Sequence, residues 1–343
     1  MTHASQAGTR TDGRTLLILP RMHGFFSLFF QAVGQAYLAQ KAGMTPAVYF
    51  NSNCLYWSDE GYNGERNLWN YFFESLSPVG IEDLFPGISV NALERYDISQ
   101  FQKLCVGTPI VPNAEYPEDV IEYKSPLGVW SQRRFVHDLV NRYAILKPAI
   151  REKLDAYERE NFSSHKVIGV HYRGLEKSQG KTQDGVVPGI GFSMQDFYID
   201  EIRSRLRRYP SAKIFVATDS AQFLENAREQ FGEAVLSREA TRLNEDDEIL
   251  GLHFKQHAEM AKPLLAEEVL LDAHLLSRTN FLVHGVSNVS NAALYFNPEL
   301  PHFDVEFRHG KTAFYLKKEL IRQLARFAPS AVARLQKLVA QKP

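Results

Sequence analysis

The chain has 343 residues, enough for two domains of ordinary size. Its 39 lysines and arginines almost balance its 40 aspartates and glutamates, which argues against a general nucleic-acid-binding protein because such domains are usually strongly basic. Hydrophobic residues make up 44% of the sequence, as in globular proteins with packed cores. With 2 cysteines, the chain has neither a disulfide framework nor a cysteine-rich metal site.

The two ends of the chain differ in character from its body. Residues 1–13 are polar and are expected to form a loose tail, without the apolar stretch of a signal peptide. No segment approaches the roughly 20 apolar residues that a membrane-spanning helix needs. Residues 326–343 have apolar positions at helical spacing and predict a C-terminal helix, which either packs on the body or touches a membrane surface.

The first half opens in the strand, turn, helix and strand order that is typical of an α/β domain. The expected elements are a strand at residues 15–19, a turn at 20–24, a helix at 26–42 ended by Gly43, and a strand at 47–50. Residues 128–160 then follow a charged, helical pattern that Pro148 interrupts. We interpret this stretch as the connector between two domains.

Aromatic residues crowd the region 49–73, and their faces either pack in a core or stack on sugar rings. For residues 69–73 core packing is the better interpretation. Trp57 and Tyr62 instead lie among acidic residues and glycines. They are better candidates for an exposed loop that stacks on an acceptor sugar, with core packing as the alternative.

In the second half, strands alternate with helices, which predicts a parallel, doubly wound sheet. The run from Ser193 to Asp196 resembles a capping box and opens one of the helices. The expected strands lie at residues 167–172, 213–217, 234–236 and 281–283, and the expected helices at 193–208, 221–230 and 264–278, with another beginning near residue 287 or 288.

Three of these strands end in polar groups. Side chains alternate along a strand, so His171 and Arg173 should point to the same side. Ligands of open α/β sheets bind at the carboxyl ends of strands. An always-charged, fork-shaped guanidinium at such an end suits a phosphate. Because residues 217–220 and 284–288 form two further polar strand ends, the sequence predicts a nucleotide site.

The same three strand ends carry a resemblance to a known family. The run from His171 to Lys177 resembles the first motif of the α1,6-fucosyltransferases and related fucosyltransferases, which include the nodulation and core enzymes and, more distantly, the protein O-fucosyltransferases. Residues 215–220 resemble the second motif, and the stretch that runs from residues 271–278 to residues 287–290 resembles the third. The similarity is strongest over residues 165–297, with weaker similarity at Gly24-Phe25 and at residues 67–74.

The resemblance implies a GT-B fold, an α/β architecture of two facing Rossmann-like domains with the reaction in the cleft between them. It implies GDP-fucose as the donor, no metal, and inversion at the anomeric carbon, so that the β-linked donor gives an α-linked product. Residues 1–158 would form the N-terminal acceptor-side domain and residues 159–325 the donor-nucleotide-binding domain. The expected acceptor is a glycan or a lipid-linked oligosaccharide, handled in the cytoplasm with at most peripheral contact with the inner membrane and with no nucleic-acid partner.

The resemblance also assigns roles to residues. Arg173 would stabilise the charge that develops on the leaving diphosphate. Ser287 and Asn288 begin a helix whose free N–H groups form an anion site. His171 and Asp272 match the positions that contact guanine, although Asp272 taken alone would equally suit a solvated helix. The remaining positions matched to the donor site are His23, Gly24, Asp219, Ser220 and Val289.

The resemblance leaves the catalytic base open. The core enzyme has a glutamate beyond the first motif, where this chain has Ser-Gln-Gly-Lys at residues 178–181. Glu176 and Asp184 are the nearby candidates, and His23 is another. Glu176 alternatively pairs with Lys177 or Arg173 and only positions it.

We expect no metal cofactor, because the sequence has no Asp-x-Asp pair and because His253 and His257, which have the spacing of two ligands on a helix, lack a third ligand. Two alternatives to a fucosyltransferase stay open. One is a GT-B transferase that uses another sugar nucleotide, since the motifs contact mostly the GDP. The other is a catalytically silent module that binds GDP or a glycan, since the base position is unfilled.

Overall fold

A computed structural model describes residues 13–21, 23–113, 120–174, 194–243 and 262–311 of the chain. The predicted tail over residues 1–13, except Gly13, and the predicted helix over 326–343 lie outside these ranges. So do Glu176, Asp184, and the histidine pair at 253 and 257.

The first half forms a three-stranded parallel sheet. Its strands are β1 (Thr15–Ile18), β2 (Thr45–Val48) and β3 (Ile110–Pro112), in the order β2-β1-β3. The long helix α1 (Phe25–Lys41) connects β1 to β2. Because α1 is apolar around most of its circumference, it is buried on nearly all sides rather than lying on the surface. Gly43 follows with a φ of 71°, the left-handed conformation that ends helices.

A long excursion separates β2 from β3. It contains the 3-10 helix η1 (Leu68–Tyr71) and the short helices α2 (Ile81–Leu84), α3 (Val90–Leu93) and α4 (Ile98–Cys105). The prediction that residues 69–73 pack in a core is confirmed, since the four aromatic side chains of this run are each at most 2% exposed. Three of them, Trp69, Phe72 and Phe73, pack against the rings of α1.

The prediction of an exposed sugar-stacking loop is wrong for Trp57. Its side chain is 5% exposed, and its indole N–H donates to the carbonyl of Arg66 at 2.9 Å. The guanidinium groups of Arg66 and Arg95 lie 5.7 and 5.0 Å from its ring centroid and cover it. Tyr62 is partly buried, and its hydroxyl donates to Glu267 at 3.0 Å. The groups that cover the indole are therefore two arginines, and not the acidic residues and glycines that suggested exposure.

Two helices, α5 (Pro126–Tyr143) and α6 (Pro148–Asn161), link the halves as the pattern predicted. Pro148 opens α6 at its first turn, where a missing N–H costs nothing, so it separates two helices rather than interrupting one. The predicted boundary between residues 158 and 159 stays a prediction.

The second half forms a five-stranded parallel sheet in the order β6-β5-β4-β7-β8. The predicted strands and helices are present within one to two residues, and β3 and β8 are the strands that the pattern missed. The strands are β4 (Val167–Tyr172), β5 (Lys213–Thr218), β6 (Val235–Leu236), β7 (Phe281–His284) and β8 (His302–Asp304). The helices are α8 (Met194–Arg208), α9 (Ala221–Phe231), α10 (Lys262–Ser277) and α11 (Asn288–Phe296), followed by a π-helical turn (Phe307–Lys311).

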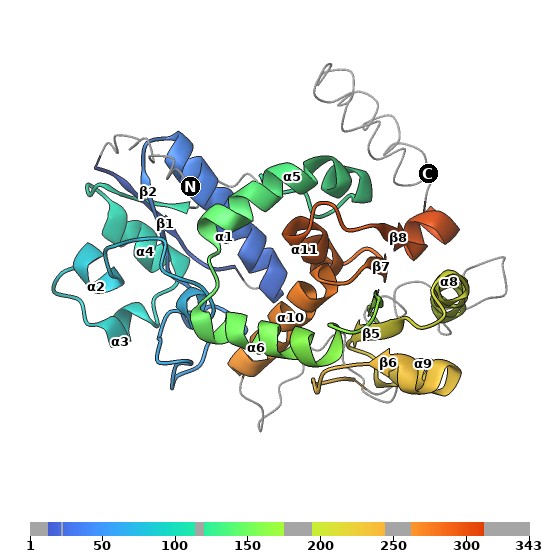
Figure 1. Cartoon of the computed structure of the whole chain (residues 1–343). Coiled ribbons are helices and arrows are strands. Elements are labelled where there is room, and N and C mark those ends of the chain that lie inside the picture. Colours follow the sequence, from blue (N-terminus) through green and yellow to red (C-terminus); the bar gives the residue numbers. More distant parts are fainter. Residues whose placement is uncertain (1–12, 22, 114–119, 175–193, 244–261, 312–343) are drawn as a thin grey trace, which may run out of the picture.

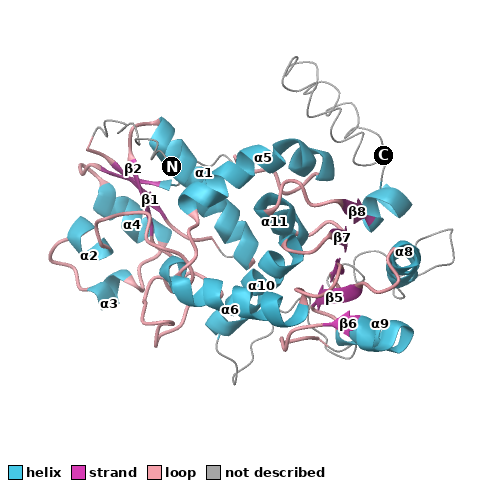
Figure 2. Cartoon of the chain, in the orientation of Figure 1, coloured by secondary structure: helices cyan, strands magenta, loops and turns pink. Residues whose placement is uncertain are grey.

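Alternation along the strands gives this sheet two apolar faces. Ile214 and Val216 of β5 pack with α8 and α9, whereas Phe215 and Ala217 face the other way. On that second side, α10 and α11 share one continuous core with α1 and α5 of the first half. Figures 1 and 2 show the two sheets on opposite sides of the molecule, with α1, α10 and α11 between them.

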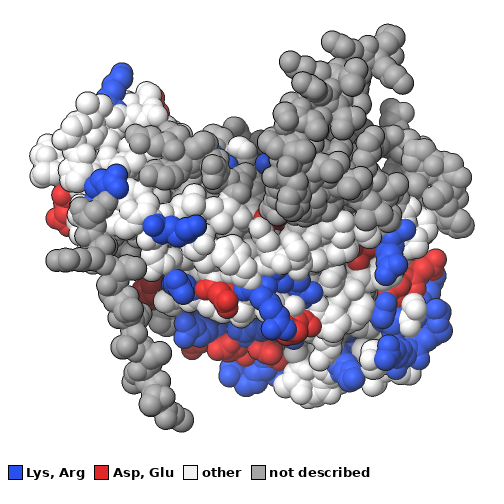
Figure 3. Space-filling model, turned by 90° about the horizontal axis from the view of Figure 1, so that it is seen from above, with Lys and Arg blue, Asp and Glu red and all other residues white. Residues whose placement is uncertain are grey.

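The strand order of the five-stranded sheet decides whether the three polar strand ends can form one site. β4 is central and pairs with β5 on one side and β7 on the other, so the three polar strand ends are neighbours, as predicted. On the face shown in Figure 3, basic and acidic side chains of the described residues are interspersed, which fits the near balance of charges in the sequence. Among the described residues, no helix combines the length and apolarity that crossing a membrane requires.

Candidate functional site

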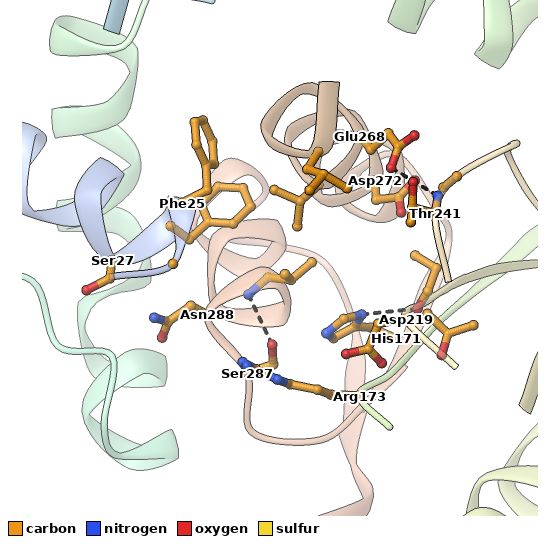
Figure 4. A pocket seen from close by; sticks show the side chains of 18 of the residues that line it. Phe25, Ser27, His171, Arg173, Asp219, Thr241, Glu268, Asp272, Ser287 and Asn288 are labelled. Atoms are coloured by element: carbon orange, nitrogen blue, oxygen red, sulfur yellow. Dashed lines mark hydrogen bonds between the residues drawn. The ribbon is translucent and has the colours of Figure 1, made fainter. Parts of the chain in front are cut away.

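A cavity of about 350 Å³ opens at these strand ends. Its walls come from both halves of the chain. The first half contributes the N-terminus of α1 with Tyr56 and Tyr123, and the second half contributes the ends of β4 and β5, residues 240 and 241, and the faces of α10 and α11. Figure 4 shows how these side chains surround the space. We call this space the pocket.

His171 and Arg173 both line the pocket, as expected from their alternation on β4. His171 is 6% exposed, and its Nδ1 lies 3.1 Å from the carbonyl oxygen of Ala217. Because a carbonyl oxygen only accepts, Nδ1 carries a hydrogen, and Nε2 of the neutral ring is therefore the acceptor nitrogen.

Arg173 is fixed by the residue that follows it. The N–H of Gly174 donates to Oδ1 of Asp219 at 2.7 Å, which ties the end of β4 to the end of β5. A Cβ on Gly174 would lie 2.8 Å from Cβ of Ser220, so this close approach requires glycine. Asp219 lines the pocket as predicted.

Ser220, which the resemblance matches to the donor site, is the N-cap of α9. Its hydroxyl accepts from the N–H of Phe223 at 3.1 Å and caps α9, and it is 7% exposed. The residues that line the pocket include Asp219 but not Ser220. The side chain therefore supports the wall from behind.

The N-terminus of α11 faces the pocket beside Arg173 (Figure 4). Ser287 is the N-cap, and its hydroxyl accepts from the N–H of Val289 at 3.3 Å. Ser287, Asn288 and Val289 all line the pocket. The arginine and the helix terminus place positive charge and N–H groups at one end, a combination that suits an anion.

The N-terminus of α1 forms the opposite wall at this end. His23 is exposed at the rim, and Gly24 precedes the first helical residue. A Cβ on Gly24 would meet only the hydroxyl of Tyr56, at 3.9 Å, so a side chain there would extend into the pocket without a clash. Tyr56 accepts from the N–H of Phe25 at 3.2 Å. Burial raises the pKa of Tyr56 to about 12, while the nearby charge of Arg173 acts to lower it.

The far end of the pocket carries two carboxylates, Glu268 and Asp272, one turn apart on α10. Asp272 is paired with Arg238, whose Nη1 lies 3.1 Å from its Oδ1, and its side chain is 16% exposed. It is therefore not a solvated helix residue. Burial raises the pKa of Asp272, and the charges of Arg238 and Arg242 act to lower it. Glu268 accepts from the N–H of Thr241 at 3.0 Å.

Sequence reasoning missed several lining residues. Glu268 had a usable signal, because it precedes Asp272 by four positions and so shares its helix face. Tyr56, Tyr123 and Thr241 had none, because only the tertiary structure brings them to the strand ends. Among the residues that the structure describes, no group of three or more histidine, cysteine, aspartate or glutamate side chains is placed to hold a metal ion.

No protein-family model matches this sequence, and neither does any curated protein sequence. Solved structures do match. A structure of the α-1,6-fucosyltransferase NodZ soaked with GDP-fucose has a TM-score of 0.50 at 18% identity, over 85% of this chain and 95% of that chain. A structure of the fucosyltransferase NodZ from Bradyrhizobium has a TM-score of 0.50 at 20% identity, over 86% and 96%.

A structure of POFUT1 in complex with GDP-fucose also has a TM-score of 0.50, at 12% identity, over 86% of this chain and 98% of that chain. At such identities the likeness establishes the fold. The α/β fold class predicted from the sequence is confirmed, since the chain has parallel sheets and shares its fold with solved fucosyltransferases.

Proposed function

We propose that this protein is a fucosyltransferase that moves L-fucose from GDP-fucose to a glycan acceptor, with inversion and without a metal. The observation that carries the proposal is the composition of the pocket. One end combines Arg173 with the N-terminus of α11, and the other end presents a partly buried carboxylate, Asp272. The fold shared with enzymes solved with GDP-fucose supports the same donor.

The phosphate end supplies the chemistry of the leaving group. As the bond from the anomeric carbon to the diphosphate breaks, negative charge grows on the departing oxygen. A guanidinium and helix N–H groups that are already in place stabilise this charge more in the transition state than in the ground state. Asp219 supports Arg173 indirectly, because it holds the N–H of the next residue.

The base end supplies selection of the nucleotide. An ionised carboxylate accepts from N1–H and from the N2 amino group of guanine, which neither adenine nor uracil presents in the same pattern. We assign this role to Asp272, which lines the far end of the pocket. We also propose that Nε2 of His171, the acceptor nitrogen in the tautomer that the Ala217 carbonyl favours, contacts a guanine N–H.

The acceptor hydroxyl must lose its proton as it attacks. His23 lies at the rim of the pocket and is one candidate base, and Glu176 and Asp184 are the others. We propose that the acceptor, a glycan or lipid-linked oligosaccharide, approaches from the α1 side, where Phe25, Phe26 and Tyr123 offer apolar faces. A cytoplasmic location with at most peripheral contact with the inner membrane completes this proposal.

The test is calorimetric titration of the purified protein with GDP, UDP, CMP and GDP-fucose, in the presence and absence of EDTA. Selective binding of GDP and GDP-fucose that the chelator leaves unchanged supports the proposal. A preference for UDP or CMP would favour a transferase with another sugar nucleotide. GDP binding without consumption of GDP-fucose against a panel of acceptor glycans would favour the silent binding module.

A further inference from the structure

Residues 238–243 close the base end of the pocket, and we call them the base clamp. The clamp is anchored at its C-terminal end, where the N–H of Leu243 donates to the carbonyl of Asp219 at 2.7 Å and its carbonyl accepts from Ala221 at 3.0 Å. Thr241 attaches its middle to α10 through Glu268. The clamp thus connects the end of β5, which borders the phosphate end, with the helix that carries Asp272.

Arg238 is the side chain of the clamp that reaches Asp272. Its Nη1 lies 3.1 Å from Oδ1 of Asp272 and 3.1 Å from the carbonyl oxygen of Glu268. Its own carbonyl accepts from Arg242 at 2.9 Å, which fixes the backbone from which it extends. Arg238 is not among the residues that line the pocket, so it contacts Asp272 from behind.

The two carboxylates of α10 are used differently. The carboxylate of Glu268 accepts hydrogen bonds from the clamp, namely from the N–H and the hydroxyl of Thr241. Asp272 accepts a hydrogen bond from Arg238 through Oδ1, and no other described residue donates to it. Its second oxygen and the remaining lone pair are therefore available to a ligand in the pocket.

We propose that Arg238 is a positioning residue that holds the Asp272 carboxylate in place for a nucleobase, so that the base clamp sets which nucleotide the pocket selects. This inference rests on the proposed function and goes beyond it, because it assigns base selection to a residue outside the pocket. An arginine locked by two hydrogen bonds restrains the rotation of the carboxylate. A free carboxylate would lose part of its preference for two parallel N–H groups.

Arg238 also keeps Asp272 in the accepting form. Burial acts to raise the pKa of Asp272, and the charges of Arg238 and Arg242 act to lower it. Glu268 lies one turn away on the same helix. Among the described residues, Tyr157 on α6 is a further titratable neighbour of Asp272. Removal of Arg238 raises the pKa of Asp272 further. A protonated Asp272 would present an O–H to the N1–H of guanine, so guanine binding would weaken as the pH falls. In a variant without Arg238, this weakening would begin at a higher pH than in the wild type.

The experiment compares GDP with ADP, which share the diphosphate and differ in the base. Calorimetry of Arg238→Met should show a loss of GDP affinity of roughly tenfold or more, as expected for one charge-assisted recognition contact, while ADP affinity changes by less than about twofold. Arg238→Lys should keep most of the preference, because it keeps the charge. The loss in Arg238→Met should grow as the pH is lowered, because the raised pKa of Asp272 brings its protonation to a higher pH.

Arg203→Met is the matched control. Arg203 pairs with Asp200 at the same 3.1 Å, but on the exposed surface of α8, so its removal should leave the ratio of GDP to ADP affinity unchanged. An Arg238→Met variant with the wild-type ratio and the wild-type pH profile would overturn the inference. Equal losses for GDP and ADP would overturn it too, because they would indicate a structural role. Failure of the wild type itself to bind GDP would instead overturn the proposed function.

Discussion

The substitution Gly174→Ala tests how the strand ends hold Arg173. The added Cβ would lie 2.8 Å from Cβ of Ser220 and 3.3 Å from Oδ1 of Asp219. Carbon atoms in contact normally lie about 3.5–4.0 Å apart, so one partner must move by roughly 0.7 Å or more. Ser220 is buried and caps α9, which leaves the segment after β4 as the part that shifts.

That segment begins with the residue that we place at the diphosphate. A misplacement of about 1 Å of a group that acts on the reacting atoms costs on the order of 10²-fold in rate. We therefore expect kcat for fucose transfer, measured as GDP release in the presence of acceptor glycans, to fall about 100-fold in Gly174→Ala. The affinity for GDP should fall less, because the base end is unchanged.

A second substitution provides the rescue. Ser220→Gly removes the Cβ that causes the clash, and glycine at an N-cap costs only a few tenths of a kcal/mol relative to serine. The double variant should recover most of the lost activity. Wild-type activity in Gly174→Ala would refute the argument from close approach. Inactivity of Ser220→Gly alone would refute the placement of Ser220 behind the wall and return it to the donor contact that the sequence predicted.

Three further predictions concern Arg173, Trp57 and His274. Arg173→Ala should keep the fold, judged by its Tm, but should reduce kcat by ~10²-fold or more, as loss of a preorganised charge stabiliser does. Near-wild-type turnover would contradict the proposal that Arg173 stabilises the leaving diphosphate. Trp57→Ala should lower the free energy of unfolding by about 3–5 kcal/mol in urea, as truncation of a core aromatic does, and an unchanged midpoint would argue for the exposed loop instead. Burial and Arg278 lower the pKa of His274 from 6.5 to about 3. Between these two pH values the unfolded chain binds a proton at His274 and the folded chain does not. Its stabilising contribution is present above pH 6.5 and is lost as the pH falls below it, so Tm should fall less between pH 7 and pH 5 in His274→Phe than in the wild type.

The sequence predicted the centre of the second sheet because β4 and β5 are apolar runs of six residues each, bounded by loops. β4 and β5 are buried on both faces and read as continuous hydrophobic stretches. The missed strands β3 and β8 have three residues each, too few to show a period, and they exist because a neighbouring strand supplies their hydrogen bonds. Whether these segments form strands therefore depends on pairing within the sheet and not on their own sequence.

The site was predictable to the extent that its groups follow strands. His171, Arg173 and Asp219 sit at the tips of β4 and β5, where alternation and sheet order place them without further information. Trp57 was predicted wrongly because charged neighbours usually indicate solvent, whereas here two arginines lie over its ring. Arg238 was not predicted at all, since its partner lies 34 positions away on another element.

The two ends of the pocket differ in the groups that line them. Backbone groups dominate one end, and side chains dominate the other. At the phosphate end, the N-termini of α1 and α11 contribute backbone groups, and the side-chain requirement falls mainly on Arg173 and on glycine at 174. At the base end, the recognition that we propose depends on the side chains of α10 and the base clamp. A change of nucleotide would therefore need only substitutions around Asp272 and Arg238, whereas a change of the leaving-group chemistry would need a different backbone. In our proposal the acceptor side is bounded by α1 and Tyr123, both from the first half of the chain. This is why motifs of the second half point to a donor nucleotide and leave the acceptor to be found by experiment.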